Sequence, residues 1–248
     1  MKTIFSRFMG RKKKDKIEIW TPFKGLPRVI PIKEAYHFIP SWFKKTPPWC
    51  DEQTEHYGTI DKGTIKRCPG VSELMSLGFV IPLWCDLQIQ IFDNGSFTWK
   101  TPDPRFRCAD HSSKQLTDYL PLDAKPTLIL KPECPWYIKT PPGISMLQLP
   151  MFWHFNPNFT VAAGILWTDL HYSINQQIMF HKKGEILLKR GTPLAQYIPI
   201  RREKIPFQVG EETDELKLAR EESHWHIRTK FRGGFSEQKK KQEAKCPY

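Results

Sequence analysis

Four side chains in the second half of the sequence have the chemistry that binds a metal ion. His154, Asp169, His171 and His181 lie on or beside consecutive predicted strands. Two histidines and one carboxylate form a ligand set that suits non-haem iron. Because side chains alternate along a strand, the Asp169-x-His171 spacing predicts two ligands on one face of a strand. One hypothesis is therefore a cupin-like, metal-dependent enzyme of the oxygenase type, with a divalent metal such as iron as its cofactor.

Each of these residues also has a structural explanation. His154 lies in an aromatic-rich loop, and His181 precedes a plain Lys-Lys-Gly turn. The group does not follow the H-x-H or H-x-D order usual for cupin-like barrels. The sequence contains no G-x-S-x-G nucleophile elbow, no G-x-x-x-x-G-K-[ST] loop and no strand-anchored G-x-G-x-x-G. Binding without catalysis is therefore the leading interpretation, with catalytic residues unknown and no cofactor.

The cysteines point to structural thiols. Six stand at positions 50, 68, 85, 108, 134 and 246, and no two have C-x-x-C spacing. Zinc ribbons and thioredoxin-like redox sites use that spacing, so their signature is missing. Free and mostly buried thiols are the expectation in a reducing cytoplasm. A zinc site built from distant Cys and His residues stays an open alternative.

The elements that would position these residues are mostly strands. Residues 136–202 hold the densest run of strand-like segments, with turn residues between them every 8–12 residues or so, roughly the spacing of an all-β domain. Aromatic residues make up 13% of the chain and 22 prolines interrupt it, which favours strands and turns over helices. Such spacing is typical of sandwiches and barrels. We therefore expect a mainly β fold, a β-sandwich or jelly roll of cupin-like shape.

Local patterns define several elements before or within that run. Apolar residues alternate with glutamines and an Asn-Gly pair follows, which predicts a β-hairpin over residues 87–100. Residues 68–78 carry the pattern of a short internal helix that ends at Gly78. A proline-bearing turn is expected at residues 132–135, between two strands.

Two polar segments and one aromatic group complete the central part. Residues 51–66 are polar and punctuated by glycine, and residues 101–126 are polar and bear prolines, so both are expected to be surface loops. Trp42, Phe43 and Trp49 are expected to cover the core, because aromatic side chains bury a large apolar area. The alternative is an exposed ridge that binds a partner.

The periodicity changes near the C-terminus. Apolar and small residues recur at three- and four-residue steps, which predicts an amphipathic helix within residues 211–234 that bears Leu216, Ala219, Ser223, Ile227 and Phe231 on one stripe. Thr213 is the expected N-cap. The helix packs back on the sandwich or meets another subunit, and packing back is the preferred interpretation because short helices depend on tertiary contact.

Charge is distributed unevenly along the chain. Of the net charge of +12, the first 17 residues carry +6, from seven basic residues and one Asp. Their candidate contacts are Arg7, Arg11, Lys12, Lys13, Lys14 and Lys16. Such an arm is either a solvated tail or an electrostatic contact with nucleic acid or an acidic partner. The chain thus divides into a basic flexible arm (1–17), a β-sandwich or cupin-like domain (18–210), a C-terminal helix (211–234) and a polar basic tail (235–248).

Two runs in the central domain resemble a known group of proteins. Residues 136–145 contain Thr-Pro-Pro-Gly, residues 189–199 contain Gly-Thr-Pro-Leu-Ala-Gln-Tyr-Ile-Pro, and Asp169 lies between them. Together with Pro-Leu-Trp-Cys-Asp-Leu-Gln-Ile-Gln-Ile at residues 82–91, they resemble an uncharacterised family of tailed-phage and bacterial proteins, over residues 35–205. The resemblance implies a phage origin and a β-rich domain of unknown function. It provides no catalytic residues to transfer.

A function follows as an expectation. Both motifs read as rigid turns, in which proline and glycine fix the entry into a strand. The chain shows no signal peptide and no apolar run near the roughly 20 residues that span a bilayer. We therefore expect a soluble, non-secreted, phage-encoded binding or structural protein without catalysis. It would be virion-associated or interact with the host, in the host cytoplasm or the virion. Its partner would be a virion or host protein, and its basic arm would allow nucleic acid.

Overall fold

The computed structural model describes residues 16–56, 59–121, 125–229 and 240–241. The chain forms two units, which divide between Glu203 and Lys204. Of the basic arm, Lys16 is described and exposed, while Arg7, Arg11, Lys12, Lys13 and Lys14 lie outside the described residues. The first unit is built mainly from antiparallel strands, so the expected mainly β class is confirmed. The finer jelly-roll or cupin-like topology stays a prediction.

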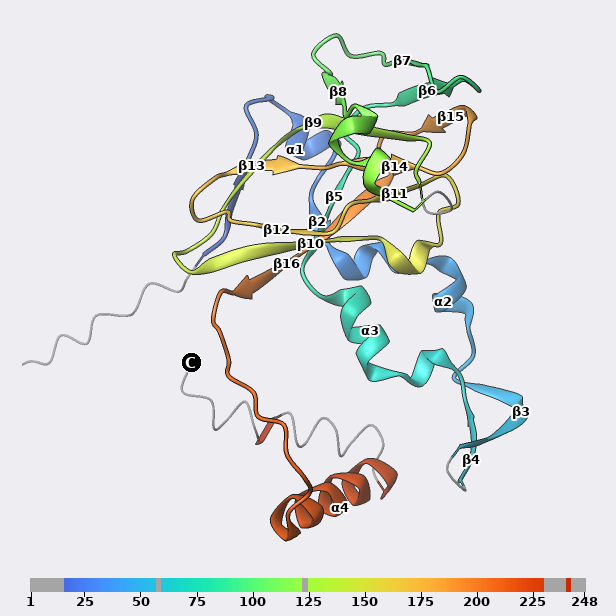
Figure 1. The fold of residues 1–248 in the computed structure, drawn as a ribbon, viewed down its shortest axis with the longest axis vertical. Coiled ribbons are helices and arrows are strands. Elements are labelled where there is room, and N and C mark those ends of the chain that lie inside the picture. The colour runs from blue at the N-terminus through green and yellow to red at the C-terminus, as the bar shows by residue number, and fades with distance from the viewer. Residues whose placement is uncertain (1–15, 57–58, 122–124, 230–239, 242–248) are drawn as a thin grey trace, which may run out of the picture. The chain divides into compact units, whose positions relative to one another are not determined.

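One sheet is organised around the long strand β9 (Figure 1). Its strands are β1 (Glu18–Trp20), β8 (Cys108–Asp110), β9 (Leu128–Lys139), β11 (Phe159–Val161), β13 (Ser173–Asn175) and β14 (Ile178–Phe180). The main path runs β1-β9-β14-β11, and β8 and β13 also pair with β9. β9 therefore holds together strands that come from distant parts of the sequence.

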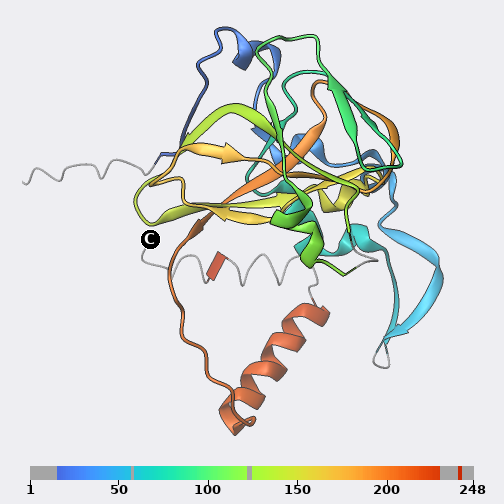
Figure 2. The ribbon, with the colours of Figure 1, turned by 45° about the horizontal axis from the view of Figure 1, so that its top comes forward.

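The second sheet has five strands in the order β12-β10-β16-β5-β2. They are β2 (Lys33–Glu34), β5 (Phe79–Pro82), β10 (Ile144–Pro150), β12 (Gly164–Leu166) and β16 (Pro193–Arg201). Figure 2 shows this sheet lying beside the first one, within the same unit. Side chains from both sheets meet in one hydrophobic cluster. Four of its members are fully buried, at 0% exposure: Leu130, Ile138, Met146 and Ile178. The two sheets thus share a single core.

The expected hairpin is confirmed in a third sheet, whose order is β15-β6-β7. β6 (Leu87–Ile91) pairs with β7 (Phe97–Lys100) and with β15 (Gly184–Leu188). The apolar side chains of β6 are buried and alternate with its glutamines, as the sequence pattern predicts. Gly95 adopts φ +83° in the connecting turn, a conformation that favours glycine.

Two expected loops contain strands instead. Most of residues 51–66 belong to a hairpin of β3 (Trp49–His56) and β4 (Thr59–Gly63), which begins two residues before this segment. A two-stranded sheet that pairs only within itself needs no alternating apolar face, so the sequence shows little sign of it. Within residues 101–126 lies β8, which pairs with β9. Both surface-loop predictions are therefore wrong at these positions.

The turn expected at residues 132–135 is also wrong, because β9 continues through both prolines. Proline cannot donate to a ladder, and is tolerated at strand irregularities. Pro132 stands at the last pair of the β8 ladder. Pro135 falls between Glu133 and Tyr137, the two residues at which the register with β13 shifts. The prolines thus occupy the places where β9 changes partner.

Four α-helices are described: α1 (Leu26–Val29), α2 (Ser41–Lys45), α3 (Pro69–Ser76) and α4 (Asp214–Thr229). The expected internal helix is α3, and Gly78 follows its end with φ +71°. A Cβ at Gly78 would stand 2.0 Å from the Tyr197 carbonyl oxygen, so only glycine fits. The Gln196 side-chain amide donates to the carbonyls of Leu74 and Leu77 at 2.7 and 2.6 Å, and satisfies the end of the helix.

A polar network crosses the core next to this glutamine. The buried Tyr197 hydroxyl donates to Gln148 Oε1 at 2.8 Å and accepts from Gln176 Nε2 at 2.9 Å. The Gln148 amide donates in turn to the Ala162 carbonyl at 2.9 Å. Burial raises the pKa of Tyr197 well above its ordinary value, so the hydroxyl keeps its proton. Within the Gly-Thr-Pro-Leu-Ala-Gln-Tyr motif, Gln196 thus serves in helix capping and Tyr197 in core hydrogen bonds.

The second unit contains α4, which begins close to the expected start of the C-terminal helix. Thr213 is confirmed as its N-cap, since its Oγ1 accepts from the Leu216 N–H at 3.3 Å. Arg220 pairs with Glu212 at 2.6 Å. Phe231 and the tail 235–248 lie outside the described part, apart from residues 240–241. No helix in the described ranges combines the length and hydropathy that crossing a membrane requires.

Candidate functional site

The strongest candidate site is a pocket of about 340 Å³ beside an aromatic loop, residues 151–155. The loop follows the end of β10 and contains one turn of 3₁₀ helix, η6 (Phe152–His154). Phe152 and Phe155 are 57% and 67% exposed at its rim. β11 and the start of β16 provide the opposite wall, including Val161 and Leu194. The pocket therefore lies where β11, an edge strand of the first sheet, approaches the end of β10 and the start of β16 in the second.

Contacts to the N-terminal part of the unit hold this loop in place. The Trp42 indole N–H donates to the Trp153 carbonyl at 2.8 Å. The Trp42 ring also lies 6.3 Å from the Trp153 ring and 5.7 Å from the Phe155 ring, measured between centroids. His154 Nε2 donates to the Phe38 carbonyl at 2.9 Å. The loop is thus held in place by residues that lie more than a hundred positions earlier in the sequence.

Phe155 has a left-handed backbone, with φ 48° and ψ 44°. Among the described residues, it is the one non-glycine residue with a positive φ. Such a conformation costs an ordinary side chain about 1–2 kcal/mol, and it is retained where the surrounding structure imposes it. Strain of this kind concentrates at functional sites. Here it turns an aromatic ring outward at the rim of the pocket.

Three polar side chains of the pocket, those of His154, Asn156 and Thr160, have partners within the protein. Asn156 Oδ1 accepts from the N–H groups of Asn158 and Phe159 at 2.9 and 3.4 Å. Burial lowers the pKa of His154, while its bond to a carbonyl works in the opposite direction. His154 is therefore neutral at neutral pH. The surface of the pocket is mainly apolar, and it therefore suits an apolar group of a ligand.

The structure does not gather the four metal-ligand candidates. His154 lies in the aromatic loop, where it bonds to the backbone. His181 shares a hydrogen bond of 2.9 Å with Thr160, another residue of the pocket. Asp169 and His171 lie in and beside a turn, so the strand predicted for them is wrong. Within the described ranges, no three His, Cys, Asp or Glu side chains are placed to hold a metal ion.

Asp169 has a structural partner instead. Arg202 donates to its carboxylate through both terminal nitrogens, one of them at 2.6 Å, and to Ser145 Oγ at 2.9 Å. The Gly143 N–H donates to the same carboxylate at 3.0 Å. These bonds, chiefly those from Arg202, hold the pKa of Asp169 at about 2. The carboxylate thus links the Thr-Pro-Pro-Gly turn to Arg202, the residue that follows β16.

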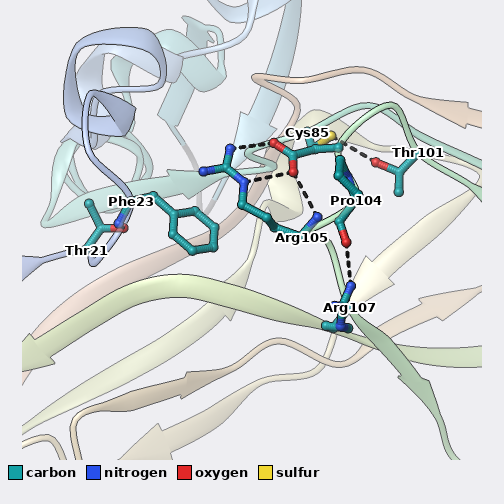
Figure 3. Close-up of polar contacts among 8 residues, drawn as sticks. Thr21, Phe23, Cys85, Thr101, Pro104, Arg105 and Arg107 are labelled. Atoms are coloured by element: carbon teal, nitrogen blue, oxygen red, sulfur yellow. Dashed lines mark hydrogen bonds and ion pairs between the residues drawn. The ribbon is translucent and has the colours of Figure 1, made fainter.

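A second cavity, of about 540 Å³, borders Cys85 and Asp103. Figure 3 shows the polar side chains beside it. Arg105 pairs with Asp103 at 2.6 Å, and its guanidinium lies 4.6 Å from the centre of the Phe23 ring. Hydrogen bonds from Arg105 lower the pKa of Asp103 to about 2. Cys85 Sγ lies 2.9 Å from Thr101 Oγ1. Because these groups contact one another, we interpret the cluster as stabilising the fold.

The described cysteines are free thiols, as the sequence predicts. Burial is the main cause that raises the pKa of Cys108 and of Cys134 to about 12. Both therefore stay protonated at neutral pH and are poor nucleophiles. Cys50 and Cys68 are exposed, so the expectation of mostly buried thiols holds for only part of the set.

Comparison with known proteins adds no assignment: no family model and no curated protein matches the chain. The pocket must therefore be judged on its own geometry. From the sequence, His154 is a metal-ligand candidate and the aromatic residues around it form a loop. The signal that could have found the site is the run Met-Phe-Trp-His-Phe directly after a strand-ending proline, because aromatic residues in a loop need a surface to cover.

Proposed function

We propose that this chain is a phage-encoded binding protein that acts without catalysis and receives an apolar side chain of a protein partner in the pocket beside the aromatic loop. The partner is a virion or host protein, and the site of action is the host cytoplasm or the virion. The observation that carries the proposal is the pair of exposed rings, Phe152 and Phe155, at the rim of an apolar pocket of about 340 Å³.

The physical argument is that of an interface anchor. Protein interfaces draw most of their binding energy from a few aromatic residues beside well-packed pockets. Exposed aromatic side chains that are held rigid lose little entropy on binding. The loop meets that condition, because the Trp42 and His154 hydrogen bonds fix it to the rest of the unit. The phage origin is supported by the motif likeness over residues 35–205.

The experiment compares purified virions that carry wild-type protein with virions that carry Phe152→Ala. Truncating an interface anchor costs about 2 kcal/mol or more, roughly a 30-fold loss of affinity. Quantitative mass spectrometry should therefore find the wild-type chain in the particle and a strongly depleted variant. Leu187→Ala is the matched control, because Leu187 is 53% exposed on β15 and does not line the pocket.

One result would narrow the proposal and another would refute it. Absence of the wild-type chain from purified virions sinks the virion-associated version and leaves the host-interaction version. Equal incorporation of Phe152→Ala and Leu187→Ala shows that the pocket is not the interface. Circular dichroism of each purified variant establishes that its fold is retained.

A further inference from the structure

A second surface, which shares no residue with the pocket, combines aromatic rings with positive charge. We define the Trp20 face as Trp20, Tyr137, Lys139 and Tyr172. Trp20 stacks on Tyr137 with centroids 5.7 Å apart and an interplanar angle of 18°. Tyr172 meets Trp20 edge-on at 5.7 Å, and Lys139 Nζ lies 5.9 Å from the Tyr172 ring. Trp20 and Tyr172 are 40% and 37% exposed.

Strand pairing places these rings on the outer side of the β9 sheet. Trp20 is paired with Tyr137 across the β1–β9 ladder, and Ser173 pairs with Tyr137 on the other side. Ile138, between Tyr137 and Lys139, is fully buried and points to the core. The rings therefore stand on the face of β9 that is turned away from the core. Figure 1 shows β13, the strand that pairs with β9 at Tyr137.

The face continues into a groove along the same strand. A hollow of about 350 Å³ extends from Tyr137 past Ser173 and Asn175 to Lys131 and Arg107. Lys131 and Lys139 are eight positions apart on β9, which corresponds to about 26 Å at the usual rise of a strand. Cations thus stand at both ends of a track whose middle is aromatic and polar. Glu133 also lines the groove.

The sequence carries more positive charge directly before β1. The first 17 residues carry +6, and Lys16, the last basic residue among them, is exposed two positions before β1. Trp20, the last residue of β1, follows the arm after two residues. Glu18 opposes Lys139 in the ladder and is the one acidic residue of β1. A long polyanion that contacts the arm would therefore meet the rings next.

We propose that the Trp20 face and the groove beside it bind single-stranded nucleic acid. Proteins that bind single strands combine a basic track for the phosphates with aromatic rings on which successive bases stack. Duplexes keep their bases stacked inside the helix, so exposed rings favour the single strand. An acidic protein would use the same cations, but it has no planar bases to occupy the stacked Trp20 and Tyr137 rings.

The test is fluorescence anisotropy of a labelled 20-nucleotide oligodeoxythymidine, titrated with the full chain. Loss of a stacking ring weakens binding about 5- to 150-fold, so Trp20→Ala should bind that much more weakly while Trp20→Phe keeps most of the affinity. Glu18→Gln should bind more tightly than wild type, because it removes a negative charge beside Lys139. Gln substitutions at Arg11, Lys12, Lys13 and Lys14 should reduce the magnitude of the log–log salt slope by about 3.

Several outcomes would overturn this proposal. One is the absence of an anisotropy change at low salt. A second is equal affinity of wild type and Trp20→Ala, since the arm alone would then be the binder. A third is equally tight binding of a duplex of the same length. Displacement of the oligonucleotide by polyglutamate of equal charge would assign the face to an acidic protein instead. Thermal unfolding of each variant shows whether a loss reflects the face or the fold.

Discussion

The left-handed residue of the aromatic loop gives the sharpest prediction about stability. Phe155 is to be replaced by Gly, Asn and Ala in the full chain. All three variants lose the same ring, which is 67% exposed and lies 5.7 Å from the Trp42 ring and 6.0 Å from the Trp153 ring. They differ in how well they tolerate φ 48°. The series therefore separates the cost of the backbone from the loss of ring contacts.

The magnitudes follow from two terms. Each aromatic pair contributes about 0.5–1.5 kcal/mol, and all three variants lose two such pairs. Left-handed backbone costs Ala about 1–2 kcal/mol in the folded state. Gly avoids that strain. Its unfolded chain is more flexible, however, and this lowers the free energy of unfolding by about 0.5–1 kcal/mol. Phe155→Gly should therefore be more stable than Phe155→Ala by about 1 kcal/mol, with Phe155→Asn between them.

The assay is urea unfolding followed by tryptophan fluorescence, with the free energy of unfolding extrapolated to water. An Ala variant as stable as the Gly variant would refute the reasoning, because the loop would then hold no backbone strain at this position. The Gly variant also has a functional use. It should be the least destabilised of the three and still lose partner binding, since it lacks the exposed ring.

Three further predictions concern the parts of the fold that support the site. Gly78→Ala should destabilise the protein by about 1–3 kcal/mol more than Gly25→Ala in urea unfolding, because both glycines have positive φ but only Gly78 has a carbonyl oxygen at 2.0 Å from the added Cβ. Tyr197→Phe should cost about 1–3 kcal/mol, since it leaves two buried glutamine side chains with an unmet hydrogen bond. Asp169 has its pKa lowered to about 2, so its bonds with Arg202 stabilise the fold above the ordinary carboxyl pKa of 3.8 and are lost as the pH falls toward 2. A melting-temperature profile from about pH 5 to about pH 2 should therefore be flatter for Asp169→Asn than for wild type, and parallel profiles would contradict this.

Local patterns predict the elements whose partners lie close in sequence. The hairpin of β6 and β7 follows from alternation around an Asn-Gly turn, and α3 from its apolar face and Gly78. The prolines of β9 locally predict a turn, and the sequence pattern therefore predicts two strands where the structure has one. Its true partners, β1, β8, β13 and β14, come from segments on both sides of it, and no local pattern reports them.

The candidate site shows the same limit. The sequence places His154 in an aromatic loop, which is correct, but the pocket needs β11 and β16 beside that loop. Asp169 is a candidate because of its spacing from His171, whereas its actual partner, Arg202, is 33 residues away. A carboxylate in sequence looks the same whether it binds a metal or an arginine. Only the tertiary pairing of β10 with β16 distinguishes the two.

Site-specific photocrosslinking tests whether the aromatic loop is a partner-binding surface. Benzoylphenylalanine is placed at position 152, or at the similarly exposed position 187 as a control, and the chain is irradiated in phage-infected cells. We expect one reproducible product from position 152, a virion or host protein identified by mass spectrometry. We also expect that Phe155→Gly in the same chain lowers the yield. Identical products from both positions, or none from position 152, would contradict partner binding by this loop.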